Sequence, residues 1–210
     1  MNSLWSKLPN SYDPNWFKKF EPLFSSIKPG DICIDCGANI GSISVLMAER
    51  GARVYAFEPN PIAFKELSRS LAGQSGVVVY NKAVLDVAGQ MPLYFHKNHK
   101  NNPIFHSTSS SLIVQKTNID PMNYQEVEVV NLPKFILGLD APVHIVKIDI
   151  EGAEYQLLKG MIETGAIYRA EHVLVETHAY KIPELQRDDA TIRSLIKARG
   201  LGKRISLDWD

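Results

Sequence analysis

Short apolar runs alternate with helix-like segments along most of the 210-residue chain, and this alternation constrains its fold more than any other feature. Runs typical of buried strands lie at about 31–36, 53–58, 76–82, 143–149 and 172–178. Segments with the apolar spacing of helices lie at about 40–50, 61–71, 153–165 and 189–199. Strands that alternate with helices usually form a mostly parallel sheet with helices on both faces. The sequence therefore predicts an α/β fold with a Rossmann-like sheet.

Residues that favour helix ends mark several of the expected boundaries. Asn39, Asn60 and Asp188 stand where an N-cap side chain is expected. Gly51 and Gly200 follow the expected ends of two helices, where glycine is favoured.

The length and composition fit a single globular domain, residues 1–210. Apolar residues make up 45% of the chain and charged residues 22%, and a chain this long can bury a full core. We expect a helical, aromatic-rich lead-in over residues 1–29. After the third predicted strand, runs at 89–96 and 124–131 predict a β-hairpin insertion, joined by the polar segment 96–122. Such a segment is typical of either a binding lid or a solvated loop, and the sequence leaves both interpretations open.

The charge balance and the start of the chain restrict its partners and location. Twenty-three Lys and Arg residues oppose 23 Asp and Glu residues. Because proteins that bind phosphate backbones usually carry a basic excess, a nucleic-acid partner is disfavoured. Residues 1–7 lack the charged and apolar regions of a signal peptide, and no apolar run has the length of a membrane span. We therefore expect a cytoplasmic protein without a membrane span.

The two cysteines, Cys33 and Cys36, form a C-x-x-C motif that can serve redox or metal chemistry. They lie within the first predicted strand, where positions three apart point to opposite faces. We therefore interpret them as two small buried apolar residues.

The turn after the first predicted strand carries the pattern of a nucleoside site. Gly37 and Gly41 let the backbone turn sharply and approach a ligand, and Asp35 places a carboxylate at the strand end. Glu58 ends the second predicted strand, where an acid can accept hydrogen bonds from both ribose hydroxyls. A purely structural glycine turn is the alternative. The glycines together with the two acids favour a nucleoside that carries a positive charge nearby.

A dinucleotide such as NAD is the competing ligand. Its G-x-G-x-x-G fingerprint has a middle glycine that lets the backbone reach the pyrophosphate, and here Asn39 occupies that place. Asp35 would repel a pyrophosphate, whereas it suits the cationic amino-acid end of S-adenosylmethionine. The residues therefore favour S-adenosylmethionine.

Several motifs of the chain resemble the FkbM-type methyltransferases. The likeness extends over roughly residues 31–180, and the block Lys147 to Glu154 is its most specific part. The segments that carry it are DCGANIG at 35–41, EPNP at 58–61, IVKIDIEGAE at 145–154 and VLVETH at 173–178.

This resemblance implies a class I methyltransferase fold, S-adenosylmethionine as methyl donor, and O-methylation of sugar or polyketide hydroxyls. It also assigns cofactor-binding positions to this chain. These are Asp35, Gly37, Ala38, Asn39, Gly41 and Asp149 for the methionine moiety, Glu58, Pro59 and Asn60 for the ribose, and Asn81 and Ala83 for the adenine edge.

Two features depart from the family pattern. The family often carries a Leu-Asp pair before its fourth strand, and here Leu132-Pro133 lacks the acid. Class I methyltransferases usually add two strands after the last helix, whereas only one strand-like run, 204–209, precedes the end at Asp210. We therefore expect a trimmed sheet or a domain of a larger multidomain protein, and a homo-oligomer is equally compatible.

Three charged residues alternate along the predicted strand at 143–149 and just beyond it. Lys147, Asp149 and Glu151 would therefore share a face, with Asp149 beside the expected methyl position. An alcohol is a poor nucleophile, so a general base accelerates its methylation. We predict that Asp149, with Glu151 beside it, acts as the base or orients the acceptor. The alternative is that Asp149 caps the next helix and holds the ammonium of the cofactor.

Four further residues complete the predicted site. Glu176 and His178 would share one face of their strand, and His178 is a candidate catalytic proton acceptor, although a histidine there is often structural. Ser111, Glu154 and Glu176 are expected to bind the acceptor.

A divalent cation is an additional option for this site. Asp149, Glu151, Glu176 and His178 offer ligands that Mg²⁺ accepts, oxygen above all. The sequence does not decide whether these side chains share one coordination sphere.

The residues together predict an S-adenosylmethionine-dependent O-methyltransferase that acts on a sugar, a glycan or another small molecule. One alternative is a non-catalytic nucleoside-binding module, suggested by Pro133 in place of an acid and by the short C-terminus. Another is an RNA or protein methyltransferase, which the zero net charge does not favour.

Overall fold

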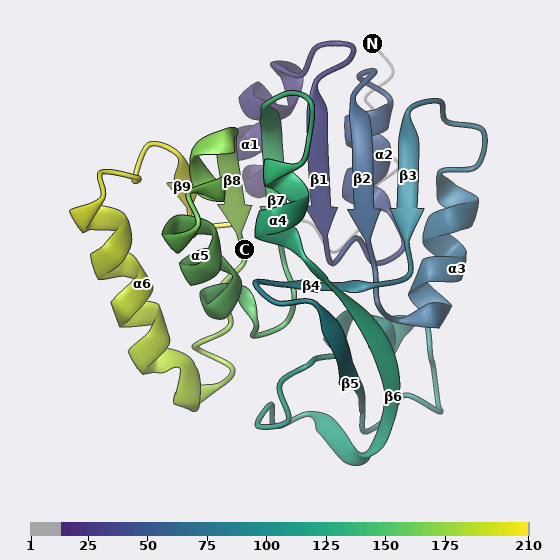
Figure 1. Ribbon diagram of the computed structural model, residues 1–210. Coiled ribbons are helices and arrows are strands. Elements are labelled where there is room, and N and C mark those ends of the chain that lie inside the picture. The colour runs from purple at the N-terminus through teal and green to yellow at the C-terminus, as the bar shows by residue number, and fades with distance from the viewer. Residues whose placement is uncertain (1–13, 210) are drawn as a thin grey trace.

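Within residues 14–209, which the computed structural model describes, a six-stranded parallel sheet forms the centre of the molecule (Figure 1). Trp5 and Tyr12 of the predicted lead-in lie outside the described residues. The spatial order is β3-β2-β1-β7-β8-β9. These strands are β1 (Ile32–Cys36), β2 (Arg53–Phe57), β3 (Val77–Tyr80), β7 (Val143–Ile148), β8 (Ala170–Val175) and β9 (Ile205–Ser206). Every neighbouring pair is parallel, which confirms the predicted α/β fold.

Helices cover both faces of the sheet, and each face has its own apolar core (Figure 1). One core contains residues of α1 (Pro14–Ser25), α2 (Ser42–Ala48) and α3 (Pro61–Ser70). The other contains residues of α4 (Leu132–Leu137), α5 (Glu154–Glu163) and α6 (Gln186–Ala198). The short 3-10 helices η3 (Ala166–Arg169) and η4 (Pro183–Leu185) precede β8 and α6. In the described part of the chain, none of the helices has the length and apolarity needed to cross a membrane.

The two cysteines show how the strands divide these cores. Cys33 lies in the core beneath α1 and α2, and Cys36 lies in the core beneath α4 and α5. Both are free thiols with fully buried side chains, as predicted. Burial raises the pKa of Cys33 to about 12 and raises that of Cys36 further, so both thiols stay protonated at neutral pH.

A second, three-stranded sheet lies at the carboxyl ends of the parallel strands, below their arrowheads in Figure 1. It consists of β4 (Ala83–Leu85), β5 (Gly89–His96) and β6 (Ile119–Asn131), with β6 between the other two. β5 and β6 pair antiparallel, which confirms the predicted hairpin insertion, whereas the short β4 was not predicted. The polar segment between β5 and β6 includes the 3-10 helix η2 (Phe105–Ser109).

Some predicted helix boundaries are correct and others are not. The Asn60 side chain accepts two backbone N–H groups at the start of α3, as predicted for an N-cap. Asn39 does not cap α2, because the helix begins only after Gly41 and the Asn39 side chain bonds the next backbone N–H. Asp188 lies within the first turn of α6 rather than before it. Gly200 has φ +64° just beyond α6, as expected of a terminating glycine.

The strand ends determine where the predicted site residues lie. β7 ends at Ile148, so Asp149 and Glu151 belong to the turn that follows it. β8 begins two residues earlier than expected and ends at Val175, so Glu176 and His178 also follow their strand. The candidate side chains therefore sit on loops at one edge of a rigid sheet, a common arrangement for binding sites.

Candidate functional site

The turn after β1 approaches the end of β7 so closely that glycine is required at position 37. Gly37 has φ +74°, and a Cβ atom built there would lie 1.8 Å from the carbonyl oxygen of Asp149. The N–H groups of Gly37 and Ala38 both donate to the carbonyl of Phe57 over 3.0 Å. The turn therefore brings together the ends of β1, β2 and β7, the place where ligands of parallel α/β sheets gather.

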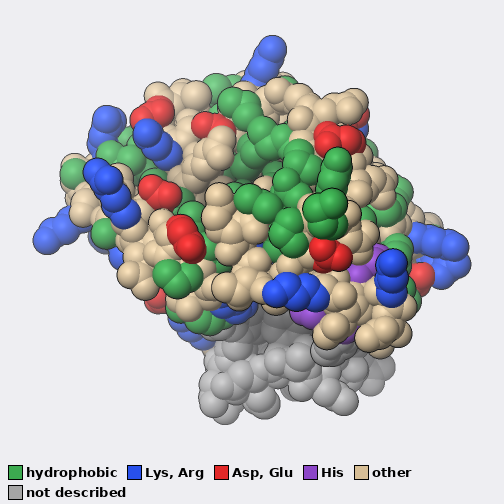
Figure 2. Space-filling model, turned by 90° about the horizontal axis from the view of Figure 1, so that it is seen from below, with side chains coloured by type: hydrophobic (Ala, Val, Ile, Leu, Met, Phe, Trp, Pro, Cys, Tyr) green, Lys and Arg blue, Asp and Glu red, His purple; other side chains and the backbone are tan. Residues whose placement is uncertain are grey.

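A cavity of about 870 Å³ opens at this edge, between the parallel sheet and the insertion. Figure 2 views this end of the molecule and shows apolar side chains gathered across the middle of the face. The volume lies in the upper part of the range of roughly 300–1,000 Å³ that is usual for small-molecule sites. The predicted site residues that line it are Gly37, Ala38, Asn39, Glu58, Pro59, Ala83, Asp149, Glu151 and Glu176. The predicted site residues that do not line the cavity are Asp35, Gly41, Asn60, Asn81, Ser111, Glu154 and His178.

Glu58 is held rigidly at the cavity wall. Its two carboxylate oxygens accept the backbone N–H groups of Asn39 and Asn60, each over 2.8 Å. Burial raises the pKa of Glu58 to about 7, although these two donors oppose the rise. A carboxylate can accept about four hydrogen bonds, so Glu58 keeps capacity for hydroxyl groups of a ligand.

Asp35 does not face the cavity, which corrects the expectation that it lines the methionine moiety. Its side chain is fully buried, and Oδ2 accepts the hydroxyl of Ser44 over 2.6 Å. Oδ1 lies 3.3 Å from Nζ of Lys147, an ion-pair distance without hydrogen-bond geometry. The Lys147 ammonium also lies 3.4 Å from Asp149 and donates to the carbonyl of Gly37 over 2.7 Å. Lys147 therefore occupies the cavity wall in front of Asp35.

Three other predicted cofactor residues shape the site without lining it. The Asn81 amide donates to the carbonyl of Glu58 over 2.9 Å and so holds the turn after β2. Asn60 caps α3, and its amide donates to the hydroxyl of Ser110 over 2.9 Å. Gly41 stands at φ +96° at the start of α2. The structure thus gives these residues supporting positions, where the sequence predicted direct contact.

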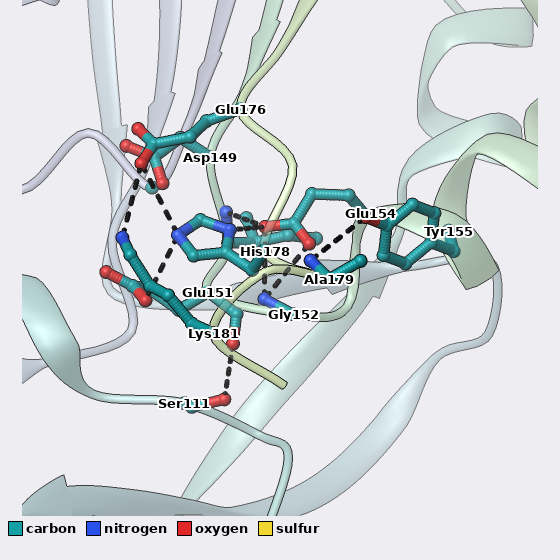
Figure 3. Close-up of polar contacts among 12 residues, drawn as sticks. Ser111, Asp149, Glu151, Gly152, Glu154, Tyr155, Glu176, His178, Ala179 and Lys181 are labelled. Atoms are coloured by element: carbon teal, nitrogen blue, oxygen red, sulfur yellow. Dashed lines mark hydrogen bonds and ion pairs between the residues drawn. The ribbon is translucent and has the colours of Figure 1, made fainter. Parts of the chain in front are cut away.

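Asp149 and Glu176 line the same part of the cavity wall. Figure 3 shows their carboxyl groups close together, each following the end of its own strand. Burial, with the neighbouring charge of Asp149, raises the pKa of Glu176 to about 7. The ammonium of Lys181 lies 3.6 Å from Glu176. Glu176 therefore has the pKa that suits a general base at neutral pH.

Glu151 is the most constrained of the cavity-lining acids. It adopts φ +58°, an uncommon conformation for a residue other than glycine. The Ser111 hydroxyl donates to its carbonyl over 2.7 Å, and the Lys116 ammonium pairs with its carboxylate over 2.5 Å. Burial raises the pKa of Glu151, while His178 and Lys116 oppose the rise. Two residues of the insertion therefore fix the position of Glu151.

His178 lies behind the cavity wall, with carboxylates on both sides of its ring (Figure 3). Nδ1 is 3.0 Å from Glu154, and Nε2 is 3.3 Å from Glu151 and 3.5 Å from Glu176. Burial lowers the pKa of His178, but the Glu154 bond and the carboxylates outweigh it and raise the pKa to about 9. The ring is therefore an imidazolium at neutral pH. This corrects the prediction that His178 accepts a proton from the acceptor.

Glu154 and Ser111 also differ from their predicted acceptor-binding roles. Glu154 is fully buried, as expected from its helix position, but its carboxylate accepts the N–H groups of Ile150 and Gly152 and contacts His178. Ser111 is buried against Glu151. Both residues hold the turn that carries Glu151.

The segment between β5 and β6 contributes Lys116 to the site, a residue that the sequence analysis did not identify. Lys116 is only 4% exposed and donates to the carbonyl of Ser109 over 3.0 Å as well as pairing with Glu151. The cavity is lined from this segment by Asn102, Ile104, Ser107, Ser109, Ser110 and Leu112. The polar run is therefore a folded wall of the cavity, and nothing in its local pattern distinguished Lys116 from its neighbours.

Among the described residues, the ion pairs at this edge form two networks, which together contain five carboxylates and four cationic groups. The acids are Asp35, Asp149, Glu151, Glu154 and Glu176, and the cations are Lys116, Lys147, Lys181 and the His178 imidazolium. With all groups ionised, the network of Lys147, Asp35 and Asp149 carries one net negative charge, and the network around His178 carries none. Asp149 of the negative network lines the cavity, where its carboxylate would attract a positively charged group of a ligand, because opposite charges attract strongly in a partly dry site.

A comparison with known families agrees with this geometry. The family model described as "Methyltransferase FkbM domain" matches residues 35–205, which include the glycine turn, Glu58 and the acids after β7 and β8. The chain belongs to the FkbM methyltransferase family. The family likeness predicted from the motifs is thereby confirmed.

Three relatives illustrate what this FkbM-family chain is similar to. The hexuronic acid methyltransferase AglP of Haloferax volcanii is 30% identical over 163 residues, covering 75% of this chain and 60% of the relative. Methyltransferase sdnD of Sordaria araneosa is 30% identical over 156 residues, covering 62% and 60%. The 31-O-demethyl-FK506 methyltransferase FkbM of Streptomyces tacrolimicus is 30% identical over 177 residues, covering 72% and 67%. The chain thus spans about 60% of the length of the first two relatives.

Proposed function

We propose that this protein transfers a methyl group from S-adenosylmethionine to a hydroxyl group of a sugar, a glycan or another small molecule. The observation that carries the proposal is the cavity itself. One wall has the Gly37 turn and Glu58, and another has Asp149 and Glu176. Membership of the FkbM family and the names of the AglP and FkbM relatives support it.

The residues present fit this cofactor. When bound, S-adenosylmethionine supplies an electrophilic methyl group on a positively charged sulfur. Glu58 would accept hydrogen bonds from the ribose hydroxyls, with Pro59 and Ala83 beside it on the cavity wall. The glycine at position 37 would let the backbone approach the methionine moiety, and the Asp149 carboxylate on the cavity wall would attract its positive charge.

We assign the proton-accepting role to Glu176, which the sequence analysis placed among the acceptor-binding residues. It lines the cavity, and its pKa of about 7 leaves a large fraction ionised at neutral pH. Glu176 would accept the proton of the acceptor hydroxyl as that oxygen bonds to the methyl carbon. Asp149 and Glu151 would orient the acceptor, and His178 would hold Glu151 and Glu176 from behind.

We propose an acceptor rich in hydroxyl groups. Asn102, Ser107, Ser109 and Ser110 line the cavity from the insertion, and their side chains can donate to and accept from sugar hydroxyls. The name of the relative AglP, a hexuronic acid methyltransferase, is consistent with a sugar acceptor.

We further propose that transfer needs no divalent cation. Asp149, Glu151 and His178 lie close enough to share an ion. However, Lys147 already pairs with Asp149, Lys116 pairs with Glu151, and His178 is protonated between carboxylates. A metal ligand must instead be deprotonated. Unchanged activity after treatment with EDTA would support this proposal, and loss of activity restored by Mg²⁺ would refute it.

The function is tested first by calorimetric titration with S-adenosylmethionine and S-adenosylhomocysteine. We expect saturable binding that Glu58→Gln weakens. The second step is incubation with radiolabelled S-adenosylmethionine and a panel of free sugars, uronic acids and macrolide alcohols. Lack of cofactor binding would reject the proposal. Binding without transfer to any acceptor, and without an effect of Glu176→Gln, would instead favour a non-catalytic module.

The remaining expectations about partners stay predictions. Salt-dependent RNA binding would contradict the expected lack of a nucleic-acid partner. Cell fractionation tests the cytoplasmic location, and gel filtration tests the expected oligomer. The expectation that the domain belongs to a larger multidomain protein also remains a prediction.

A further inference from the structure

A second group of potential metal ligands lies at the amino ends of β7 and β8, at the opposite end of the sheet from the cavity. It consists of His144, Glu171 and His172. One ligand atom of each residue lies within 4.8 Å of those of the other two. His144 and His172 are half-buried, whereas the Glu171 side chain is 58% exposed. The cluster is thus accessible from solvent and rests on rigid strands.

Strand geometry explains why these side chains meet. β1 pairs with β7 through Ile32↔Val143 and then Cys33↔Ile145, so His144 is the extra residue of a β-bulge. A bulge redirects the side chain at which it occurs. Between the pairs Val143↔Ala170 and Ile145↔His172, His144 lies opposite Glu171 on the neighbouring strand, one residue before His172. Their ring centroids lie 5.5 Å apart, at an interplanar angle of 87°.

The hydrogen bonds of His144 prepare one of its ring nitrogens for a metal. Nε2 lies 2.9 Å from the hydroxyl of Ser26, just after α1, and Nδ1 lies 2.7 Å from Glu171. Histidines that bind metals commonly donate their second ring N–H to an oxygen, which fixes the ring and its tautomer. With Nε2–H donated to Ser26, the 2.7 Å contact means that Nδ1 and Glu171 share a proton, which a metal ion would have to displace.

We propose that His144, Glu171 and His172 form a binding site for a zinc-like transition-metal ion, with water as the fourth ligand. Two imidazoles and one carboxylate suit Zn²⁺, whereas Mg²⁺ prefers oxygen ligands. The ion would take the place of the proton between Nδ1 and Glu171, and the exposed Glu171 side chain would move outward to make room.

A bound ion would link two elements of this face of the molecule. Through Ser26, the ion would also fasten the end of α1 to the sheet, so we expect it to stabilise this face.

The test uses the full chain and titration with Co²⁺ and Zn²⁺. We expect one equivalent of Co²⁺ to give the intense visible absorption of four-coordinate cobalt, and one equivalent of Zn²⁺ to displace it and raise the melting temperature. Glu171→Gln and His172→Asn should each weaken binding at least tenfold. Ser26→Ala should weaken it by roughly 10-fold, the lower end of the effect of such supporting residues. Because Glu171 is exposed, its variant should fold normally even if His172→Asn does not.

His106→Asn is the matched control, because His106 is a half-buried histidine of the insertion, outside the cluster. Its binding curve should coincide with that of the unaltered protein. If the Glu171→Gln and His172→Asn variants bind the ion as tightly as the unaltered protein does, the proposal is overturned, because the ion would then lie elsewhere. Weak binding without a fixed stoichiometry or a thermal shift would identify an adventitious ion only, and would overturn it too.

Discussion

Replacing His178 with glutamine should remove a specific part of the pH dependence of stability. The pKa of His178 is raised to about 9 in the folded protein, compared with 6.5 for an ordinary histidine. A group with a raised pKa stabilises the fold fully below its unfolded pKa, and this stabilisation is lost as the pH rises through the folded pKa. A difference of about 2.5 units corresponds to about 3 kcal/mol at the low-pH limit.

Most of this loss falls in an accessible range of pH. Between about pH 7.5 and about pH 9.5, the His178 contribution to the free energy of unfolding should fall by about 2 kcal/mol. We propose urea unfolding of the unaltered protein and of His178→Gln at these two pH values. The buried thiols of Cys33 and Cys36 add a fall of their own at high pH, because their pKa values are also raised. Both proteins contain these thiols, so their effect cancels in the difference.

The expected result is a variant that is less stable near pH 7.5 but has lost part of its sensitivity to alkali. The range starts above the pKa of about 7 of Glu176, so titration of that carboxyl contributes little. If the two proteins lose equal stability between the two pH values, His178 is not an imidazolium held by Glu154 and Glu151. The description of the site would then need revision.

Three further perturbations test other parts of the site. Gly37→Ala should abolish calorimetric binding of S-adenosylmethionine, because the added Cβ atom would overlap the carbonyl of Asp149. The control is Gly73→Ala, at a similar φ of +81° in open space, which should lower the free energy of unfolding by only about 1 kcal/mol and leave binding intact. Glu176→Gln should lower kcat about 10²–10⁴-fold with little change in cofactor binding, and the rise of activity with pH through about 7 should disappear. A retained pH profile would refute its role as base. Lys116→Gln should reduce the free energy of unfolding by about 2–3 kcal/mol. This is somewhat less than the usual effect of removing one partner of a buried ion pair, because His178 also faces Glu151. The exposed control Lys97→Gln should change the free energy of unfolding by less than about 0.5 kcal/mol. Equal effects of the two lysine variants would contradict the ion pair with Glu151.

The features of the site that could be predicted from the sequence are those set by short stretches of chain. The Gly37 turn and Glu58 follow buried strands, and the ends of parallel strands meet at one edge of a sheet. The sequence Asn60-Pro61 identified a helix start, because an N-cap side chain and a proline in the first turn both affect only the nearby backbone. The same local signal, Asn131 before Pro133, marks the unpredicted α4.

The features that could not be predicted depend on partners distant in the sequence. Lys116 lies in a polar run and gains its role only because folding brings it to Glu151, 35 residues away. Asp35 was expected to face a ligand, but the side chain of Lys147, 112 positions later in the sequence, covers it. The alternation of side chains along a strand does not show which of two residues near adjacent strand ends faces the cavity. Likewise, His178 is an imidazolium mainly because Glu154, 24 residues earlier, and Glu151 face its ring.

The division of the cavity between two sheets makes the molecule modular for engineering. The parallel sheet supplies the glycine turn and Glu58, whereas the segment between β5 and β6 supplies the serines of the opposite wall. Under the proposed function, grafting that segment from another member of the family would exchange the acceptor contacts and leave the methyl-donor half of the cavity unchanged. Such a chimera would have to retain Lys116 and Ser110, since these two residues fasten the exchangeable wall to Glu151 and Asn60.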